Sequence, residues 1–306
     1  LEPGAYTLLM TTWRAVSKAE WNAGDAENEL QWTPGPATLT YELWGPAEAI
    51  CVENDPICDP PEPTLPPTGS SSGPAAPLAL ISVMHSNNET GVIQPIAEVV
   101  KIAGDIPVHC DAVQSFTKVP LSFKDLGLFA MTISGHKVGG PLGIGALILR
   151  RAVEIPALLH GGGQERDIRS GTLNTPSIVA FATAIASHQY LSDVVTKLRD
   201  YFISSVQKLL PDAILNGAKS VRLPGIVNFT FPGTQSDTLL LLMDSANVSC
   251  STGSACSAGV HEASHVLLAM GHSEKTAQSS LRFSLGASTT QSDIDYVLSV
   301  LPDVIA

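Results

Sequence analysis

The residues best suited to chemistry follow apolar runs that are typical of β-strands. Lys137 comes shortly after the apolar run 129–133, in the stretch Ser134-Gly135-His136-Lys137. An amine on such a turn can form a Schiff base with an aldehyde cofactor if burial or a nearby cation lowers its pKa. The alternative is a solvated lysine in a glycine-containing loop.

Asp111 stands at the end of a second apolar run, 106–110. A carboxylate at a strand end can pair with a protonated pyridine nitrogen and so help the ring to accept negative charge. Gln114, three residues further on, can hydrogen-bond a ring substituent. The alternative role for Asp111 is that of a helix N-cap.

A glycine-rich stretch, 161–172, carries two arginines and ends in Thr172 before a helical pattern. Backbone amides, the Thr172 hydroxyl and a helix N-terminus can together bind phosphate without any Walker-type motif. Because glycine loops are common, this stretch supports a phosphate site only together with the other residues.

Cys256 lies in a run of small residues, 250–259, which is the setting of a reactive thiol. Cys110, inside an apolar run, and Cys250 are predicted to be structural. A zinc site is an alternative, because Cys250, Cys256, His261 and His265 have the spacing C-x5-C-x4-H-x3-H. The gap between the two thiols is wider than zinc sites usually show.

Alternating β-type and helical runs predict an α/β fold with a largely parallel sheet, in which ligands bind at the carboxyl ends of the strands. Strands are predicted at 79–84, 106–110, 129–133 and 145–149, with a helix at 95–103. A long helical pattern covers 175–210. A second, smaller α/β unit is predicted from strands at 225–231 and 280–285 and helices at 236–246, 262–270 and 291–301.

Composition excludes several classes of protein. The 306 residues are 44% hydrophobic and 15% charged, and their apolar runs are too short to span a membrane. The net charge of −12 argues against nucleic-acid binding. With five cysteines and no secretory signal, we expect reduced thiols and a cytoplasmic location.

The acidity is concentrated in the first quarter. Residues 1–78 hold 11 of the 29 acidic residues, only two of the 17 basic ones, all four Trp and no His. Eight prolines between 56 and 78 exclude a helix or a central strand there. We therefore expect this quarter to be a poorly ordered segment and a linker.

Taken together, these motifs resemble the cysteine desulfurases of the NifS/IscS type, within the class V, fold-type I pyridoxal-phosphate enzymes. The resemblance runs from about residue 77 to the C-terminus. It rests on six segments in family order, at 85–91, 111–114, 134–137, 161–172, 254–256 and 282–286. It implies an incomplete three-layer large domain at 79–175. Residues 176–306 would form a long connecting helix and a smaller C-terminal α/β domain.

The resemblance also implies a role for each residue. Lys137 would carry pyridoxal phosphate and Asp111 would pair with its ring nitrogen. Asn88 and Gln114 would contact the ring. Ser134, His136 and, across a homodimer interface, Thr172 would hold the phosphate. The catalytic residues would be Cys256, Lys137 and His136, and Arg282, with Asn88, would bind the substrate.

The implied activity is the removal of sulfur from L-cysteine, which gives L-alanine and a Cys256 persulfide. The persulfide would pass to a sulfur acceptor or an iron–sulfur scaffold protein, and Cys256 is also a candidate cluster ligand. No other metal is implied. Selenocysteine lyases of the same family and a non-catalytic remnant or interaction protein are the alternatives. Residues 1–76 hold neither the glycine-threonine phosphate loop nor the ring-stacking histidine of the family, so we expect them to be unrelated sequence.

Overall fold

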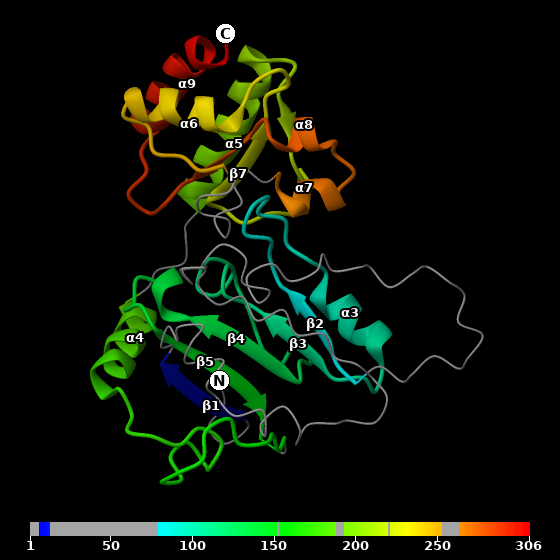
Figure 1. The fold of residues 1–306 in the computed structure, drawn as a ribbon, viewed down its shortest axis with the longest axis vertical. Helices are drawn as coiled ribbons and strands as arrows, with labels where there is room; N and C mark the ends of the chain where they lie inside the picture. Colours follow the sequence, from blue (N-terminus) through cyan, green and yellow to red (C-terminus); the bar gives the residue numbers. More distant parts are fainter. Residues whose placement is uncertain (1–5, 13–78, 152, 188–192, 220, 253–262) are drawn as a thin grey trace, which may run out of the picture.

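The computed structural model describes residues 6–12, 79–151, 153–187, 193–219, 221–252 and 263–306, which form two α/β units (Figure 1). The proline-rich stretch, Cys51, Cys58, Cys256 and His261 lie outside the described residues.

The first unit is built on a five-stranded sheet in the order β1-β5-β4-β3-β2. Its strands are β1 (Tyr6–Thr12), β2 (Ile81–Met84), β3 (Val108–Asp111), β4 (Ala130–Ser134) and β5 (Ile144–Arg150). As predicted, β2, β3 and β4 are parallel. Strand β5 is antiparallel to β4, because the short connection between them leaves no room for the crossover that a parallel pair needs.

Strand β1 was not predicted from the sequence. It pairs antiparallel with β5, with Tyr6 opposite Arg150 and Thr12 opposite Ile144. The first quarter therefore contributes an outer strand to the sheet of the first unit.

One face of this sheet is apolar and carries both helices of the unit. Helices α3 (Ile96–Ala103) and α4 (Thr175–Ser187) share a core with the inward-facing strand residues, such as Cys110 and Ile133. Because side chains alternate along a strand, the opposite face carries the polar residues of β2, β3 and β4. There His109 joins three strands, through Ser82 Oγ at 2.8 Å and Thr132 Oγ1 at 2.7 Å.

The second unit has a three-stranded antiparallel sheet in the order β6-β7-β8. Its strands are β6 (Ile214–Leu215), β7 (Ile226–Thr230) and β8 (Ser280–Ser284). Its helices are α5 (Asp193–Leu209), α6 (Ser236–Ser245), α7 (His265–Ala269), α8 (Glu274–Ala277) and α9 (Gln291–Ile305). Helices α5, α6 and α9 cover one face through a core that includes Phe202, Phe229 and Phe283.

The long helical pattern at 175–210 corresponds to two helices, α4 and α5, with residues 188–192 between them outside the description. Phe181 of α4 is buried in the core of the first unit. Phe202 of α5 is buried in the core of the second. The two halves of the pattern thus belong to different units.

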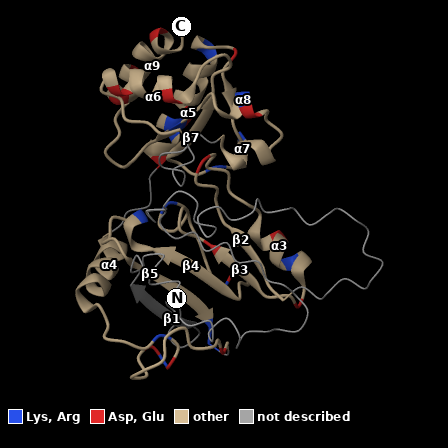
Figure 2. Cartoon of the chain, in the orientation of Figure 1, with Lys and Arg blue, Asp and Glu red and all other residues tan. Residues whose placement is uncertain are grey.

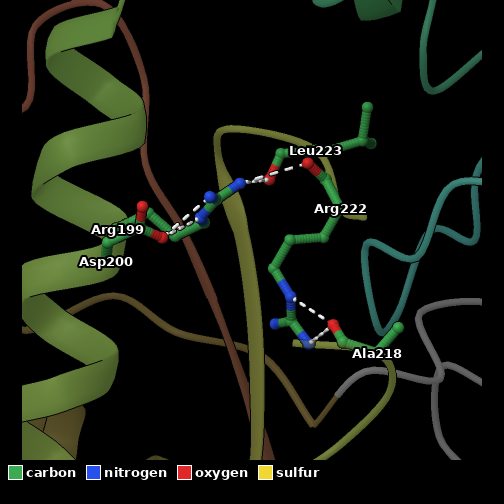
Figure 3. A network of polar contacts seen from close by, with 5 residues as sticks. All are labelled: Arg199, Asp200, Ala218, Arg222 and Leu223. Carbon is green, nitrogen blue, oxygen red and sulfur yellow. Dashed lines mark hydrogen bonds and ion pairs between the residues drawn. The ribbon is translucent and has the colours of Figure 1, made fainter. Parts of the chain in front are cut away.

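Two buried arginines hold the connection between β6 and β7, which packs on the first unit (Figure 3). Arg199 of α5 donates from Nη1 to the carbonyls of Arg222 at 3.1 Å and Leu223 at 2.9 Å. Arg222 donates to the carbonyl of Ala218. Burial and the charge of Arg199 lower the pKa of Arg222 to about 10.

This segment packs on the residues that follow β2. Leu223 N donates to the carbonyl of Gly91 at 2.8 Å, and Ile93 N donates to that of Val221 at 3.1 Å. Gly217 has φ +85°, and a Cβ there would lie 2.4 Å from Val92 Cγ2. The close approach of the two segments therefore requires glycine at 217.

Charged side chains are scattered over both units rather than gathered on one element (Figure 2). Among the described helices, none combines the length and the apolar character needed to cross a membrane.

Candidate functional site

Two of the predicted residues lie at the same edge of the first sheet. Asp111 is the last residue of β3, and Lys137 ends the short turn, Gly135–Lys137, that follows β4. Because β3 and β4 are parallel neighbours, with Asp111 opposite Thr132, their carboxyl ends meet at one edge. The sequence prediction that these residues end neighbouring strands is confirmed.

The Asp111 side chain is exposed and partly engaged with its own backbone. Its Oδ1 accepts from Val113 N at 2.9 Å, so the capping contact of the alternative interpretation is present. The turn that it caps is not an α-helix. Oδ2 has no hydrogen-bond partner in the described part of the chain, which leaves one carboxylate oxygen for a ligand.

Lys137 and His136 lie on a single 3₁₀ turn, Gly135–Lys137, and both are exposed. Ser134 Oγ and His136 Nδ1 are 2.7 Å apart. Burial and the charges of Lys137 and Lys118 lower the pKa of His136. The imidazole is therefore neutral near pH 7 and can offer an N–H to an anion.

Lys118 is a site residue that the sequence analysis missed. Its Nζ donates to Gln114 Oε1 at 3.1 Å. Burial, followed by the charge of Lys137, lowers the pKa of Lys118 to about 8. The four-residue spacing between Gln114 and Lys118 is the feature of the sequence that could have indicated this contact. The contact leaves the Gln114 amide nitrogen as the group that can donate to a ligand.

Arg282 reaches the site from the second unit. It lies on β8, and its Nη1 donates to the carbonyl of Asn88 at 3.0 Å. Its Nε is buried and has no hydrogen-bond partner among the residues that the structure describes. A half-buried guanidinium that keeps unused donors suits a carboxylate ligand. The structure thus brings together Arg282 and Asn88, to which the resemblance assigns the substrate, and their role in binding stays a prediction.

Thr172 is exposed and lies shortly before α4. The preceding loop is held by its own side chains, since Gln164 Oε1 accepts from Gly171 N at 2.9 Å and Ser170 Oγ accepts from Gly163 N at 3.2 Å. The role expected for Thr172 involves a second chain and stays a prediction.

The two described cysteines are not candidates for a nucleophile. Cys110 is fully buried, and burial together with Asp111 raises the pKa of its thiol to about 12. Burial and Asp244 raise the pKa of Cys250 to about 11. Cys256, and with it half of the candidate zinc site, lies outside the described residues, so both of those predictions remain open.

Comparison with known proteins places this fold and site in a family. Residues 75–297 match the model of the class-V aminotransferases, and the chain belongs to that family. Within it, the chain is 48% identical over 236 residues to an IscS-like cysteine desulfurase of Mycobacterium tuberculosis. It is 41% identical over 228 residues to a human cysteine desulfurase. These alignments cover 75% and 72% of the chain, and 60% and 50% of those proteins.

Solved structures give the same fold. A NifS-like protein from Rickettsia africae matches with a TM-score of 0.66 and 35% identity, over 74% of this chain and 61% of that one. The protein SspA, solved in complex with cysteine, matches with a TM-score of 0.57 and 37% identity, over 67% and 58% of the two chains. The chain thus spans about 50–60% of the length of the relatives that it matches.

Proposed function

We propose that this chain is a cysteine desulfurase that uses pyridoxal phosphate. The proposal rests on one observation: Asp111 and Lys137 lie at the same carboxyl edge of the neighbouring strands β3 and β4. Arg282 hydrogen-bonds Asn88, which follows the next strand, β2. A carboxylate, an amine and a guanidinium are the groups needed for a pyridinium nitrogen, an aldehyde and an amino-acid carboxylate, respectively.

The described residues fit this cofactor. The hydrogen-bonded pair of Ser134 and neutral His136 offers one donor to its phosphate: the imidazole Nε2–H when Ser134 donates to Nδ1, or the Ser134 hydroxyl when Nδ1–H donates to Ser134. Gln114, whose carbonyl is occupied by Lys118, offers N–H to a ring oxygen, and Asn88 would contact the ring side. Asp111 Oδ2 would hold the proton on the pyridine nitrogen. Thr172 of a second chain would complete the phosphate contacts in a homodimer.

When bound, pyridoxal phosphate withdraws electrons from the Cα of the amino acid attached to it. Lys137 Nζ would bind the cofactor aldehyde in the resting enzyme and then move the Cα proton of L-cysteine. Arg282 would bind and orient the substrate carboxylate. The Cys256 thiolate would attack the substrate sulfur, so that an S–S bond forms as the C–S bond breaks. The products are L-alanine and a Cys256 persulfide.

The proposal extends to the fate of the sulfur. We infer that a sulfur-acceptor or iron–sulfur scaffold protein takes it from Cys256, and that the reaction occurs in the cytoplasm. The support is the similarity to cysteine desulfurases along most of the chain.

Incubation of the chain with pyridoxal phosphate and L-cysteine tests the proposal. Alanine should form in the parent chain and not in Lys137→Ala. Cys256→Ala should keep the cofactor absorbance but form no persulfide. Sulfide release by Cys256→Ala at the parent rate would remove Cys256 from the mechanism. Faster turnover of selenocysteine than of cysteine would favour a selenocysteine lyase.

A further inference from the structure

Glu89 is a carboxylate buried where the two units meet, with 2% of its surface exposed. It lies in a tight turn, in which Asn87 Oδ1 accepts from the backbone N–H groups of Glu89 and Thr90, each at 2.9 Å. A carboxylate in such a place is expected to have a specific donor, because its burial without one is strongly unfavourable.

The donor comes from the second unit. Ser264 Oγ donates to Glu89 Oε2 at 2.5 Å, and Ser264 is itself buried. The same hydroxyl oxygen accepts from Leu267 N at 3.2 Å, which makes Ser264 the N-cap of α7. The Ser264 hydroxyl proton points to the Glu89 carboxylate, and a lone pair of the same oxygen points to the N–H of Leu267. Glu89 therefore holds the Ser264 side chain in the orientation that caps α7.

Asn88, the neighbour of Glu89, holds a second point of the same unit. Its carbonyl accepts from Arg282, and Arg282 pairs through its backbone with Ser251, with N···O distances of 2.6 and 3.1 Å. Ser251 and Ser264 stand on either side of the segment 253–262, in which Cys256 lies. The two residues 88 and 89 thus connect to both flanks of that segment.

We propose that Glu89 is a positioning residue for sulfur transfer, because its bond to Ser264 fixes the flank of the Cys256 segment relative to the cofactor-side turn 87–91. This role rests on the proposed function. Glu89 does not bind cofactor or substrate. Its loss should slow the attack of Cys256 without weakening the steps that precede it.

The first experiment uses the full chain without cofactor and measures backbone hydrogen exchange in α7. Glu89→Ala and Ser264→Ala should each speed exchange of the Leu267 and Leu268 amides, by about tenfold. Glu89→Gln, whose amide oxygen can still accept from Ser264, should stay near the parent, as should Glu98→Ala, an exposed acid on α3. Unchanged exchange in Glu89→Ala would overturn the proposed tether. This failure would not count against the proposed function, because no cofactor is involved.

The second experiment adds pyridoxal phosphate and L-cysteine and follows one turnover. Glu89→Ala should form the Cys256 persulfide about tenfold more slowly, while cofactor absorbance and the half-saturating cysteine concentration change less than about twofold. Glu89→Gln should restore most of the rate. Glu89→Ala/Ser264→Ala should be no slower than either single variant, because both remove one contact. The proposal would be overturned if the rate loss of the double variant were the product of the two single losses. It would also be overturned if Glu89→Ala lost cofactor binding as strongly as it lost rate.

Discussion

At the scale of single residues, the site combines two lysines with the Asp111 carboxylate at the carboxyl edge of β3 and β4. Burial, and then the charge of the nearby Lys137, lower the pKa of Lys118 to about 8. Most of the shift comes from burial. Near pH 7 Lys118 is still mainly an ammonium and can hold Gln114.

The titration of Lys118 is a direct prediction. In the parent chain its Nζ should titrate near pH 8, and in Lys137→Met the pKa should rise towards the usual lysine value, since a neighbouring positive charge is removed. NMR of ¹³C-dimethylated lysines would measure both. An unchanged Lys118 pKa in Lys137→Met would show that the two amines do not interact.

The sequence located Asp111 and Lys137 near the ends of neighbouring strands, because strand ends can be located from apolar runs. Arg282 came from the family resemblance alone, and the roles of all three residues stay predictions. The sequence did not predict Lys118 or Glu89 as functional. The Glu89 contact joins residues 175 positions apart, and nothing in the local pattern distinguishes that carboxylate from a solvated one. Such partners are set by the packing of the two units.

At the scale of elements, the buried strands β2, β3 and β4 were predictable from their apolar runs. Three elements were not predicted. Strand β6 has two residues and α8 has four, too few for a recognisable period, and β1 lies in an acidic, tryptophan-rich context. Helix α7 is shorter than its predicted span at 262–270.

The packing of the β6–β7 connection on the first unit depends on Gly217. Gly217→Ala should lower the free energy of unfolding by about 2 kcal/mol or more, because it combines a left-handed backbone with a clash against Val92. Gly233→Ala is a matched control, with φ +91° and open space around a new Cβ, and should lose only about 1 kcal/mol. Urea unfolding would compare them, and equal losses would contradict the close packing at 217.

The buried Arg199 makes a second prediction for this segment. Arg199→Ala leaves the carbonyls of Arg222 and Leu223 without their donor, which should destabilise the fold by about 2–4 kcal/mol. Lys197→Ala, an exposed cation on the same helix, should change stability by less than about 0.5 kcal/mol. Thermal unfolding of both variants is the check, and similar melting temperatures would exclude this role for Arg199.

At the scale of the whole molecule, the net charge of −12 describes two unlike parts. The acidic excess belongs mainly to residues 1–78, of which the structure describes only β1. The remainder is close to neutral and holds the class-V fold. Composition alone separated these parts. It could not predict the pairing of β1 with β5, because the partner of a strand that lies far away in the chain depends on how the whole sheet assembles.

The proposed homodimer predicts an effect of surface leucines near Thr172. Leu158 is 76% exposed in the single chain, on the approach to the glycine-rich loop. Leu158→Asp should shift the chain from dimer towards monomer, since a charge would be placed in an apolar contact. Sedimentation velocity would measure this, with Leu241→Asp on α6 as an equally exposed control. A monomeric parent chain would contradict the proposed arrangement.

In the proposed function, Lys137 binds an aldehyde cofactor at the carboxyl edge of β3 and β4. Borohydride reduction of the chain with pyridoxal phosphate, followed by peptide mass spectrometry, tests it most directly, because the reduced bond marks the lysine that held the cofactor. A pyridoxyl-phosphate label is expected on Lys137, and no label is expected at position 137 in Lys137→Ala. A label on Lys118 instead, or labelling spread over surface lysines, would contradict it.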